Sequence, residues 1–164
     1  MVLAVLAVLV VAAFILDRME ILQILPRPAE EPGKNLLVDK DRLEGAWEKN
    51  AQVPRIFVVK GSVKNQSKRP RAHIRVKAFL YDKAGKTLKE GFAYCGNPIP
   101  ARDLRTKGKD EIMKFMGNRD GQKGANKLIA PGASILFSVV FFDVPKGVES
   151  FGAQIEEAAI PGSS

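Results

Sequence analysis

Apolar and polar residues alternate over two stretches in the middle of the chain, residues 55–65 (RIFVVKGSVKN) and residues 72–82 (AHIRVKAFLYD). A period of two residues is typical of a β-strand that has one face in the core and the other in solvent. The alternation assigns these side chains to the buried faces: Phe57, Val59, Gly61, Val63, Ile74, Val76, Ala78 and Leu80. We therefore expect two half-buried antiparallel strands in this part of the chain.

Turn residues connect these two stretches to each other and to a third strand. A polar segment that ends in proline, residues 65–70 (NQSKRP), separates the two stretches, and residues 82–86 (DKAGK) supply a glycine-containing hairpin into residues 87–95. Strands that are joined by short connections are usually neighbours in one sheet. The sequence thus predicts a three-stranded meander.

The last third of the chain contains a short helix and two further strands. Residues 110–116 (DEIMKFM) have helical spacing, and the glycine-rich residues 117–125 predict a mobile loop. Residues 134–143 (SILFSVVFFD) are apolar on both faces, as expected of a strand at the centre of a sheet or beneath another layer, and residues 149–158 form the final strand. The predicted fold class is mostly β, an immunoglobulin-like antiparallel β-sandwich over residues 51–160 with one short helical insertion.

The first sixteen residues (MVLAVLAVLVVAAFIL) contain no charge, no glycine and no proline. At a rise of ~1.5 Å per residue they would form a helix of about 24 Å, slightly shorter than the roughly 30 Å hydrocarbon core of a bilayer. Two interpretations compete, a cleaved signal peptide and a retained transmembrane helix. The pattern favours the retained anchor, because no basic segment precedes the apolar run. A buried core helix is disfavoured by the absence of a polar stripe.

The segment after this run divides the rest of the chain. Mixed apolar and polar residues extend the anchor (residues 1–25) as a juxtamembrane helix, which the prolines that follow would end. Residues 26–50 are interpreted as linker and lead-in, because their proline- and charge-rich start (PRPAEEPGK) buries nothing. Residues 51–160 are assigned to the β-sandwich and residues 161–164 to a tail. The sequence leaves the membrane orientation and the oligomeric state open.

Four motifs carry a family resemblance. They are VxGxVxN at residues 59–65, IxVxAxLYD at residues 74–82, YCGN at residues 94–97, and APG at residues 130–132 ahead of FSVVF at residues 137–141. With these motifs the chain resembles an uncharacterised bacterial domain-of-unknown-function family. In that family a zinc ribbon and a single membrane span precede a β-sandwich similar to the FxLYD and late-embryogenesis-abundant modules. This chain has no Cys-x-x-Cys and therefore no zinc ribbon, and Ala78 stands where FxLYD has phenylalanine. The resemblance implies a sandwich held outside the cytoplasm, with no established activity.

Candidate chemistry in the body is sparse. The single cysteine, Cys95, excludes an intrachain disulfide and a cysteine-rich zinc site, and its apolar neighbours favour a packed side chain over a reactive thiol. The single histidine, His73, is expected on the outward side of a strand, solvated or lightly packed, and not as a general base. We therefore expect no catalytic residue, no metal site and no cofactor, and the chain is predicted not to be an enzyme.

Charge is distributed unevenly along the chain. The formal net charge is +8, and residues 51–81 contain no acidic residue. Outward positions and turns of this region supply a candidate basic face: Lys60, Lys64, Lys68, Arg69, Arg71, Arg75 and Lys77. Such a face can bind anionic lipid headgroups, an envelope polymer or an acidic protein through summed Coulomb attraction, or it can be merely solvated. Nucleic acid is disfavoured, because a domain outside the cytoplasm would seldom meet it.

Two functional hypotheses follow from the sequence. The first is a non-enzymatic interaction module that a single membrane span, residues 1–16, holds at the cell membrane, with the β domain outside the cytoplasm and a protein or anionic envelope partner. The alternative is a basic β-sandwich that binds an anionic ligand, a lipid headgroup or an envelope polymer, at the membrane surface. The two differ in salt dependence, because only attraction between exposed charges is strongly screened by added salt.

Overall fold

The structure is a computed structural model that describes residues 33–162. The predicted anchor, residues 1–16, lies outside the described residues, as do the juxtamembrane segment and the start of the linker. Within residues 33–162, no helix combines the length and the apolar character needed to cross a bilayer. The membrane span therefore stays a prediction.

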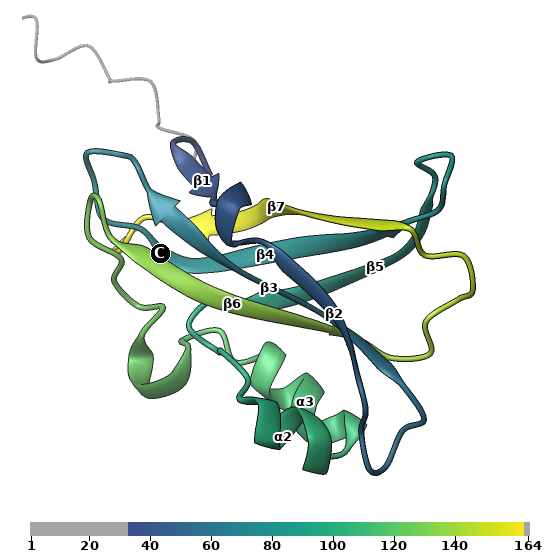
Figure 1. Cartoon of the computed structure of the whole chain (residues 1–164). Coiled ribbons are helices and arrows are strands. Elements are labelled where there is room, and N and C mark those ends of the chain that lie inside the picture. Colours follow the sequence, from purple (N-terminus) through teal and green to yellow (C-terminus); the bar gives the residue numbers. More distant parts are fainter. Residues whose placement is uncertain (1–32, 163–164) are drawn as a thin grey trace, which may run out of the picture. The chain divides into compact units, whose positions relative to one another are not determined.

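Two antiparallel sheets dominate the described residues, which form seven strands (Figure 1). The strands are β1 (Leu36–Val38), β2 (Glu44–Glu48), β3 (Ile56–Asn65), β4 (Ala72–Tyr81), β5 (Thr87–Tyr94), β6 (Ser134–Phe141) and β7 (Ser150–Ala159). In the first sheet, called sheet I here, β3 pairs with β6 on one side and with both β1 and β2 on the other. In the second, sheet II, the order is β5-β4-β7. The chain is therefore mostly β, as the sequence predicts.

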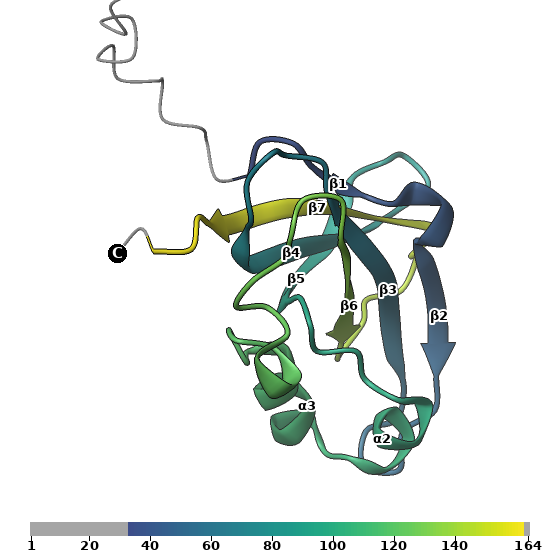
Figure 2. The same ribbon diagram turned by 90° about the vertical axis from the view of Figure 1, so that its left-hand side faces the viewer.

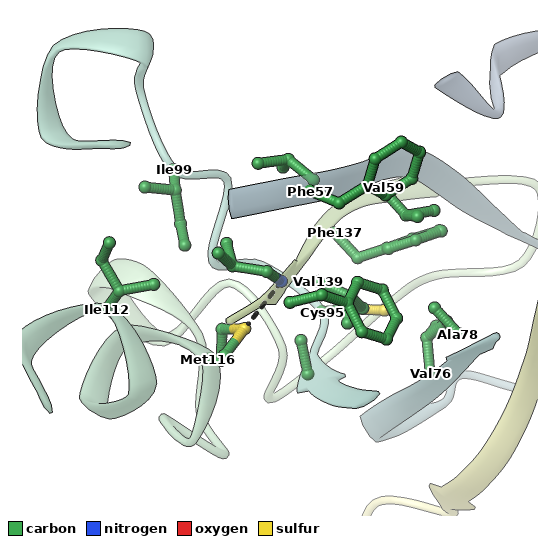
Figure 3. Close-up of a cluster of buried hydrophobic side chains, with 14 of the residues drawn as sticks. Phe57, Val59, Val76, Ala78, Cys95, Ile99, Ile112, Met116, Phe137 and Val139 are labelled. Carbon is green, nitrogen blue, oxygen red and sulfur yellow. Dashed lines mark hydrogen bonds between the residues drawn. The ribbon is translucent and has the colours of Figure 1, made fainter. Parts of the chain in front are cut away.

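The core lies between the two sheets. All eight side chains or glycines that the alternation assigns to buried faces are buried, and Val76, Ala78 and Leu80 on β4 have no exposed surface. Figure 3 shows residues of β3 and β6, such as Val59 and Phe137, facing those of β4. The predicted facing of β3 and β4 is confirmed.

A helical layer covers part of the outer face of sheet I. It consists of α2 (Ala101–Thr106) and α3 (Lys109–Met116), which lie on the side of sheet I away from sheet II (Figures 1 and 2). Ile112 and Met116 of α3 are buried, and the Val140 N–H of β6 donates to the Met116 Sδ at 3.1 Å (Figure 3). The predicted helix is confirmed. It also explains why β6 is apolar on both faces, since β6 lies at the edge of its sheet but beneath another layer.

The predicted meander is wrong at its first connection. β3 belongs to sheet I, whereas β4 and β5 belong to sheet II. The connection crosses between the sheets because the Asn65 side chain shapes it, donating to the carbonyls of Arg69 at 2.9 Å and Ile129 at 3.0 Å. The Asn65 side-chain oxygen accepts from the Ser67 N–H and hydroxyl. These bonds fold the segment into an arch instead of a hairpin.

Five elements have no counterpart in the sequence prediction. Residues 36–48, inside the stretch assigned to linker and lead-in, form β1, the 3-10 helix η2 (Lys40–Arg42) and β2. The helix α2 precedes the predicted helix. Residues 117–125 fold around a second 3-10 helix, η3 (Gln122–Gly124), where the Gln122 N–H donates to the Gly96 carbonyl at 2.8 Å. The described β structure therefore begins before residue 51.

Close packing of the sheets depends on glycines that lie under aromatic rings. A Cβ on Gly61 of β3 would be 2.7 Å from the Phe137 ring, and a Cβ on Gly45 of β2 would be 2.5 Å from the Phe151 ring. Such distances are shorter than van der Waals contact, so no side chain fits at either position unless the ring moves. These glycine–ring pairs set how closely the elements approach.

Candidate binding surfaces

The candidate basic face is divided between the two sides of the sandwich. Lys60 and Lys64 point outward from sheet I, and Arg75 and Lys77 point outward from sheet II. The sequence predicts that these strands are neighbours in one sheet, but they belong to opposite layers. The structure therefore does not bring the four cations together.

The two cations on sheet II are paired with carboxylates of neighbouring strands. Arg75 lies 3.0 Å from Glu156 and 3.0 Å from Glu157 on β7, and Lys77 pairs with Glu90 on β5. Both cations also lie within 6 Å of the Phe92 ring, Arg75 at 5.7 Å and Lys77 at 5.2 Å. The outer face of sheet II is therefore a mixed ladder of charges and rings and not a cationic surface.

The remaining basic residues lie where the described chain begins. We call this region the entry end and define it as residues 33–35, 64–71, 126–134 and 159–162. Backbone hydrogen bonds join these segments: Gln66 N–H to Asn35 at 2.8 Å, Asn65 N–H to Ala133 at 2.9 Å, and a reciprocal pair between Arg71 and Ile129 at 3.0 and 2.7 Å. Lys34, Lys64, Lys68 and Arg69 are exposed here. The entry end thus collects cations from separate parts of the chain.

Arg71 has a different place from the other members of the predicted face. Its side chain is fully buried, and its guanidinium donates to the carbonyls of Pro70 at 3.3 Å and Lys34 at 3.4 Å. A buried cation needs such acceptors, because removal from water without them is costly. Arg71 is therefore not on the surface, and it ties the start of the described chain to the arch.

His73 lies in a bulge of β4. The buried side-chain amide of Asn126 stabilises this bulge. The φ of His73 is +49°, in the left-handed region, and the β4–β7 register shifts there. The Asn126 side chain bonds both the N–H and the C=O of Ile74 at 3.1 Å. His73 Nε2 lies 3.2 Å from Asp120 Oδ1, and a hydrogen bond from Lys127 holds the pKa of Asp120 below its usual range, with a smaller contribution from His73. His73 is half-buried, in keeping with the expected light packing.

An apolar groove lies between β5 and α3. Its volume is about 480 Å³, with Gly91, Phe92 and Ala93 of β5 on one side, Met113 and Met116 of α3 on the other, and residues 140–143 between them. Phe92 is 44% exposed and Met113 is 51% exposed. Each wall of the groove therefore carries one large apolar side chain that is exposed.

The two strand edges beside the groove differ. The edge of β6 is covered by residues 96–116: the Gly96 N–H donates to the Leu136 carbonyl at 2.7 Å, and the Ile99 N–H donates to the Ser138 hydroxyl at 3.2 Å. Met116 covers it at Val140.

Among the described residues only β4 pairs with β5, which leaves the other edge of β5 open over its central part. The Cys95 N–H bonds the Ile74 carbonyl of β4 at 2.9 Å, so antiparallel alternation directs the backbone groups of Phe92 and Glu90 away from β4. β5 therefore offers backbone donors and acceptors along the groove.

The charged residues at one end of the groove are paired with each other. Lys109 of α3 lies 2.9 Å from Asp143, which follows β6, and Lys89 of β5 donates to the Asp143 carbonyl at 3.0 Å. The hydrogen bond from Lys109 holds the pKa of Asp143 below its usual range. These contacts connect both walls of the groove to its floor.

Reactive groups are sparse in the described region. Cys95 has no exposed surface, and burial raises the pKa of its thiol far above the usual range, which makes it unreactive at neutral pH. The predicted packing of Cys95 is confirmed. Among residues 33–162, no three histidine, cysteine, aspartate or glutamate side chains gather in a way that could hold a metal ion.

The groove, and a smaller hollow lined by Trp47, Arg55 and residues 144–148, could not be read from the sequence. Met113 lies on the helix face opposite the apolar stripe, and Phe92 is one aromatic residue among several on outward strand positions. In the smaller hollow, of about 330 Å³, the Arg55 guanidinium lies 3.6 Å from the centre of the exposed Trp47 ring. A stacked tryptophan–arginine pair has no signal in sequence when eight positions separate its members.

Two antiparallel sheets with a helical layer over one of them define a mostly β domain of the β-sandwich class. The chain belongs to the family described as Protein of unknown function (DUF3426), whose model matches residues 42–155. This match runs from the end of η2 into β7 and so includes the groove and the arch. No curated protein and no solved structure gives a significant match to the chain.

Proposed function

We propose that this chain is a non-enzymatic interaction module on an immunoglobulin-like sandwich, attached to the cell membrane by residues 1–16 with its β domain outside the cytoplasm. Its groove binds an extended segment of a partner protein. The observation that carries the proposal is the open edge of β5 beside the exposed Phe92 and Met113.

An extended partner segment matches both features of the groove. Added strands gain affinity from main-chain hydrogen bonds to a free sheet edge and specificity from pockets for alternate side chains. The β5 edge supplies the backbone groups of Glu90 and Phe92, and the groove floor supplies apolar contacts near Val140 and Phe142. Because α3 forms one side of the groove, the groove has room for a single added strand of a partner. A complete second sheet would not fit there.

The alternative function, binding of an anionic ligand at the membrane surface, is favoured by a separate observation, the exposed cations of the entry end. The two functions respond differently to salt. Binding in the apolar groove should change little between low and high ionic strength, whereas binding to exposed cations should weaken steeply.

Site-specific photo-crosslinking tests the groove. A photoreactive residue replaces Met113 or, as a matched control, Leu136, which is also 51% exposed but lies on the outer face of sheet I. In cells that produce the full chain, we expect a crosslink to one protein from position 113 and none from position 136. Equal crosslinking from both positions would count against the groove.

A second measurement identifies the mode of binding. With a peptide copied from the crosslinked segment, the amides of Glu90 and Phe92 should become protected from hydrogen exchange, because a new strand would bond them. Met113→Arg should weaken binding of the peptide by at least about 10-fold, and Leu136→Arg should leave it unchanged. Unprotected β5 amides in the bound state would overturn strand addition.

A further inference from the structure

The entry end carries several cations and no carboxylate side chain. Residues 33–35, 64–71, 126–134 and 159–162 contain no acidic residue. Its exposed cations form no ion pair with any residue in the range 33–162: Lys34, Lys64, Lys68 and Arg69. A fifth cation, Lys127, pairs with Asp120 at 3.2 Å. Like charges that lie close together repel each other, and an anionic partner would relieve that repulsion.

Exposed apolar side chains accompany these cations. Leu128 is 63% exposed, the largest value for a large apolar side chain among the described residues, and it directly follows Lys127. Leu37 is 46% exposed and lies opposite Lys64 in the β1–β3 pair. Cations together with protruding leucines match the two layers of a bilayer surface, anionic headgroups and the acyl boundary below them.

The scaffold beneath this surface is fixed by buried polar groups. Asn65 and Arg71 have no exposed surface, and their side chains bond the backbone of three of the four segments that form the entry end. The backbone that carries these cations is therefore already ordered and need not be rearranged for binding. The entry end thus presents its cations from one fixed backbone framework.

The position of the entry end along the chain also agrees with a membrane contact. The described chain enters the sandwich at Gly33, and sixteen residues separate it from Leu16, where the apolar run ends. Even fully extended, this connection spans no more than about 60 Å. A chain attached through residues 1–16 would thus hold this end at high effective concentration next to the lipid surface.

We propose that the entry end docks on the headgroups of anionic phospholipids, with Leu128 at the acyl boundary. This docking rests on the proposed membrane attachment but uses different residues from both the anchor and the groove. In this docked orientation the entry end contacts the membrane, and the groove between β5 and α3 lies on the side of the sandwich.

A fluorescent probe that reports polarity tests this docking in the full chain. Leu128→Cys carries the probe, and Lys83→Cys, in the exposed hairpin between β4 and β5, carries it as the control. The native Cys95 is buried and does not compete for label. Each labelled chain is mixed with vesicles of phosphatidylcholine alone or with vesicles that also contain phosphatidylglycerol.

We expect a blue shift of the Leu128 probe only with phosphatidylglycerol, reversed by high salt, and no shift of the Lys83 probe. Replacing Lys68 and Arg69 with glutamine should lower the ratio of docked to undocked protein by roughly 30-fold, at roughly 5-fold per cation. Replacing Lys83 and Lys86 with glutamine removes the same charge from the opposite end and should change nothing.

Flotation of the same samples separates the two ways in which this proposal can fail. Flotation with phosphatidylcholine vesicles in high salt reports attachment through residues 1–16. If the chain floats and the Leu128 probe shows no lipid-dependent shift, docking is overturned and attachment stands. If the chain floats only with phosphatidylglycerol and the probe shifts, docking stands and attachment is overturned. Flotation with neither vesicle overturns both.

A soluble polyanion distinguishes a bilayer from other anionic partners. Polyglutamate can neutralise the cations but offers no apolar layer, so it should leave the Leu128 probe unshifted. A shift of equal size with polyglutamate would overturn the lipid assignment in favour of a polymeric partner.

Discussion

The two ends of the sandwich differ in the contacts that dominate them. At the entry end, the buried amides of Asn65 and Asn126 bond backbone groups of segments far apart in sequence. At the opposite end, which consists of residues 47–57, 82–86 and 142–151, aromatic rings pack together beside the half-buried amide of Asn50, which donates to the Leu104 and Lys107 carbonyls. Trp47 meets Phe57 edge-on at 5.1 Å, and Phe57 lies 5.9 Å from Phe151.

This difference teaches which end has the more strictly determined geometry. A buried amide must satisfy its donors and acceptor, and few backbone arrangements do so. Ring contacts tolerate small shifts, because dispersion is not directional. The end with the fixed geometry is the one whose exposed cations have no ion-pair partner among residues 33–162, and this is the end proposed to dock on lipid.

The largest loss of stability should come from a substitution that unfolds both ends of the sandwich together. Val76 is fully buried at the centre of β4, which connects them, so Val76→Asp would place an unpaired carboxylate in the core. We expect a loss of about 3–5 kcal/mol, most of the stability of a typical small domain, measured by urea denaturation.

Lys77→Asp is the control for this change, since the adjacent side chain faces outward and pairs with Glu90. It should cost about 1 kcal/mol. Equal tolerance of the two substitutions would contradict the strand facing on which the comparison of the ends depends.

The next largest effect should be confined to the entry end. Asn65→Ala removes one donor from each of the carbonyls of Arg69 and Ile129, and it removes the acceptor of the buried Ser67 N–H and hydroxyl, at a cost of about 2–4 kcal/mol. Amides of residues 64–71 should exchange faster in the variant than those of the opposite end. The exposed neighbour provides the control, because Gln66→Ala should stay within about 0.5 kcal/mol of the parent.

A smaller effect is expected at the opposite end. Trp47→Ala removes the edge contact with Phe57 and the stacking of Arg55, although the ring is 41% exposed. Thermal unfolding should show a loss of about 1–2 kcal/mol. Trp47→Phe keeps a ring at this position and should recover part of that loss. An effect larger than that of Asn65→Ala would reverse the comparison.

The smallest effect concerns one carboxylate near each end. Lys127 lowers the pKa of Asp120, and Lys109 lowers the pKa of Asp143. A lowered pKa in the folded state contributes stability that is present above the ordinary carboxylate pKa and is lost as the pH falls through the lowered one. Because both pairs are exposed, the contribution is small.

NMR titration of the carboxyl carbons measures this effect directly. Lys127→Met should raise the pKa of Asp120 only, and Lys109→Met should raise the pKa of Asp143 only. A change at both carboxylates in either variant would show that the two ends are electrostatically coupled.

The strands of the core were predictable because each of them carries its own period. The burial of Ile74, Val76, Ala78 and Leu80 follows from their spacing alone. In contrast, β1 has three residues and β2 five, too few for a period to stand out from the surrounding loop.

The connection between β3 and β4 could not be predicted for a different reason. Its path depends on the hydrogen bond between Asn65 and Ile129, which lie 64 positions apart in sequence. Assigning the two strands to one sheet then placed Lys60 and Lys64 beside Arg75 and Lys77, although they lie on opposite layers. Clusters on a surface depend on sheet membership, which local pattern does not encode.

The glycines beneath aromatic rings have a consequence for how the sequence can diverge. The Phe137 ring fills the space in which a side chain at position 61 would lie, and the Phe151 ring does the same at position 45. A larger residue at the glycine position requires a smaller residue at the phenylalanine position. Single substitutions at either position are therefore disfavoured, whereas double substitutions that conserve the total volume are tolerated. Family members that keep this sheet spacing should therefore show paired substitutions at positions 61 and 137 and at positions 45 and 151.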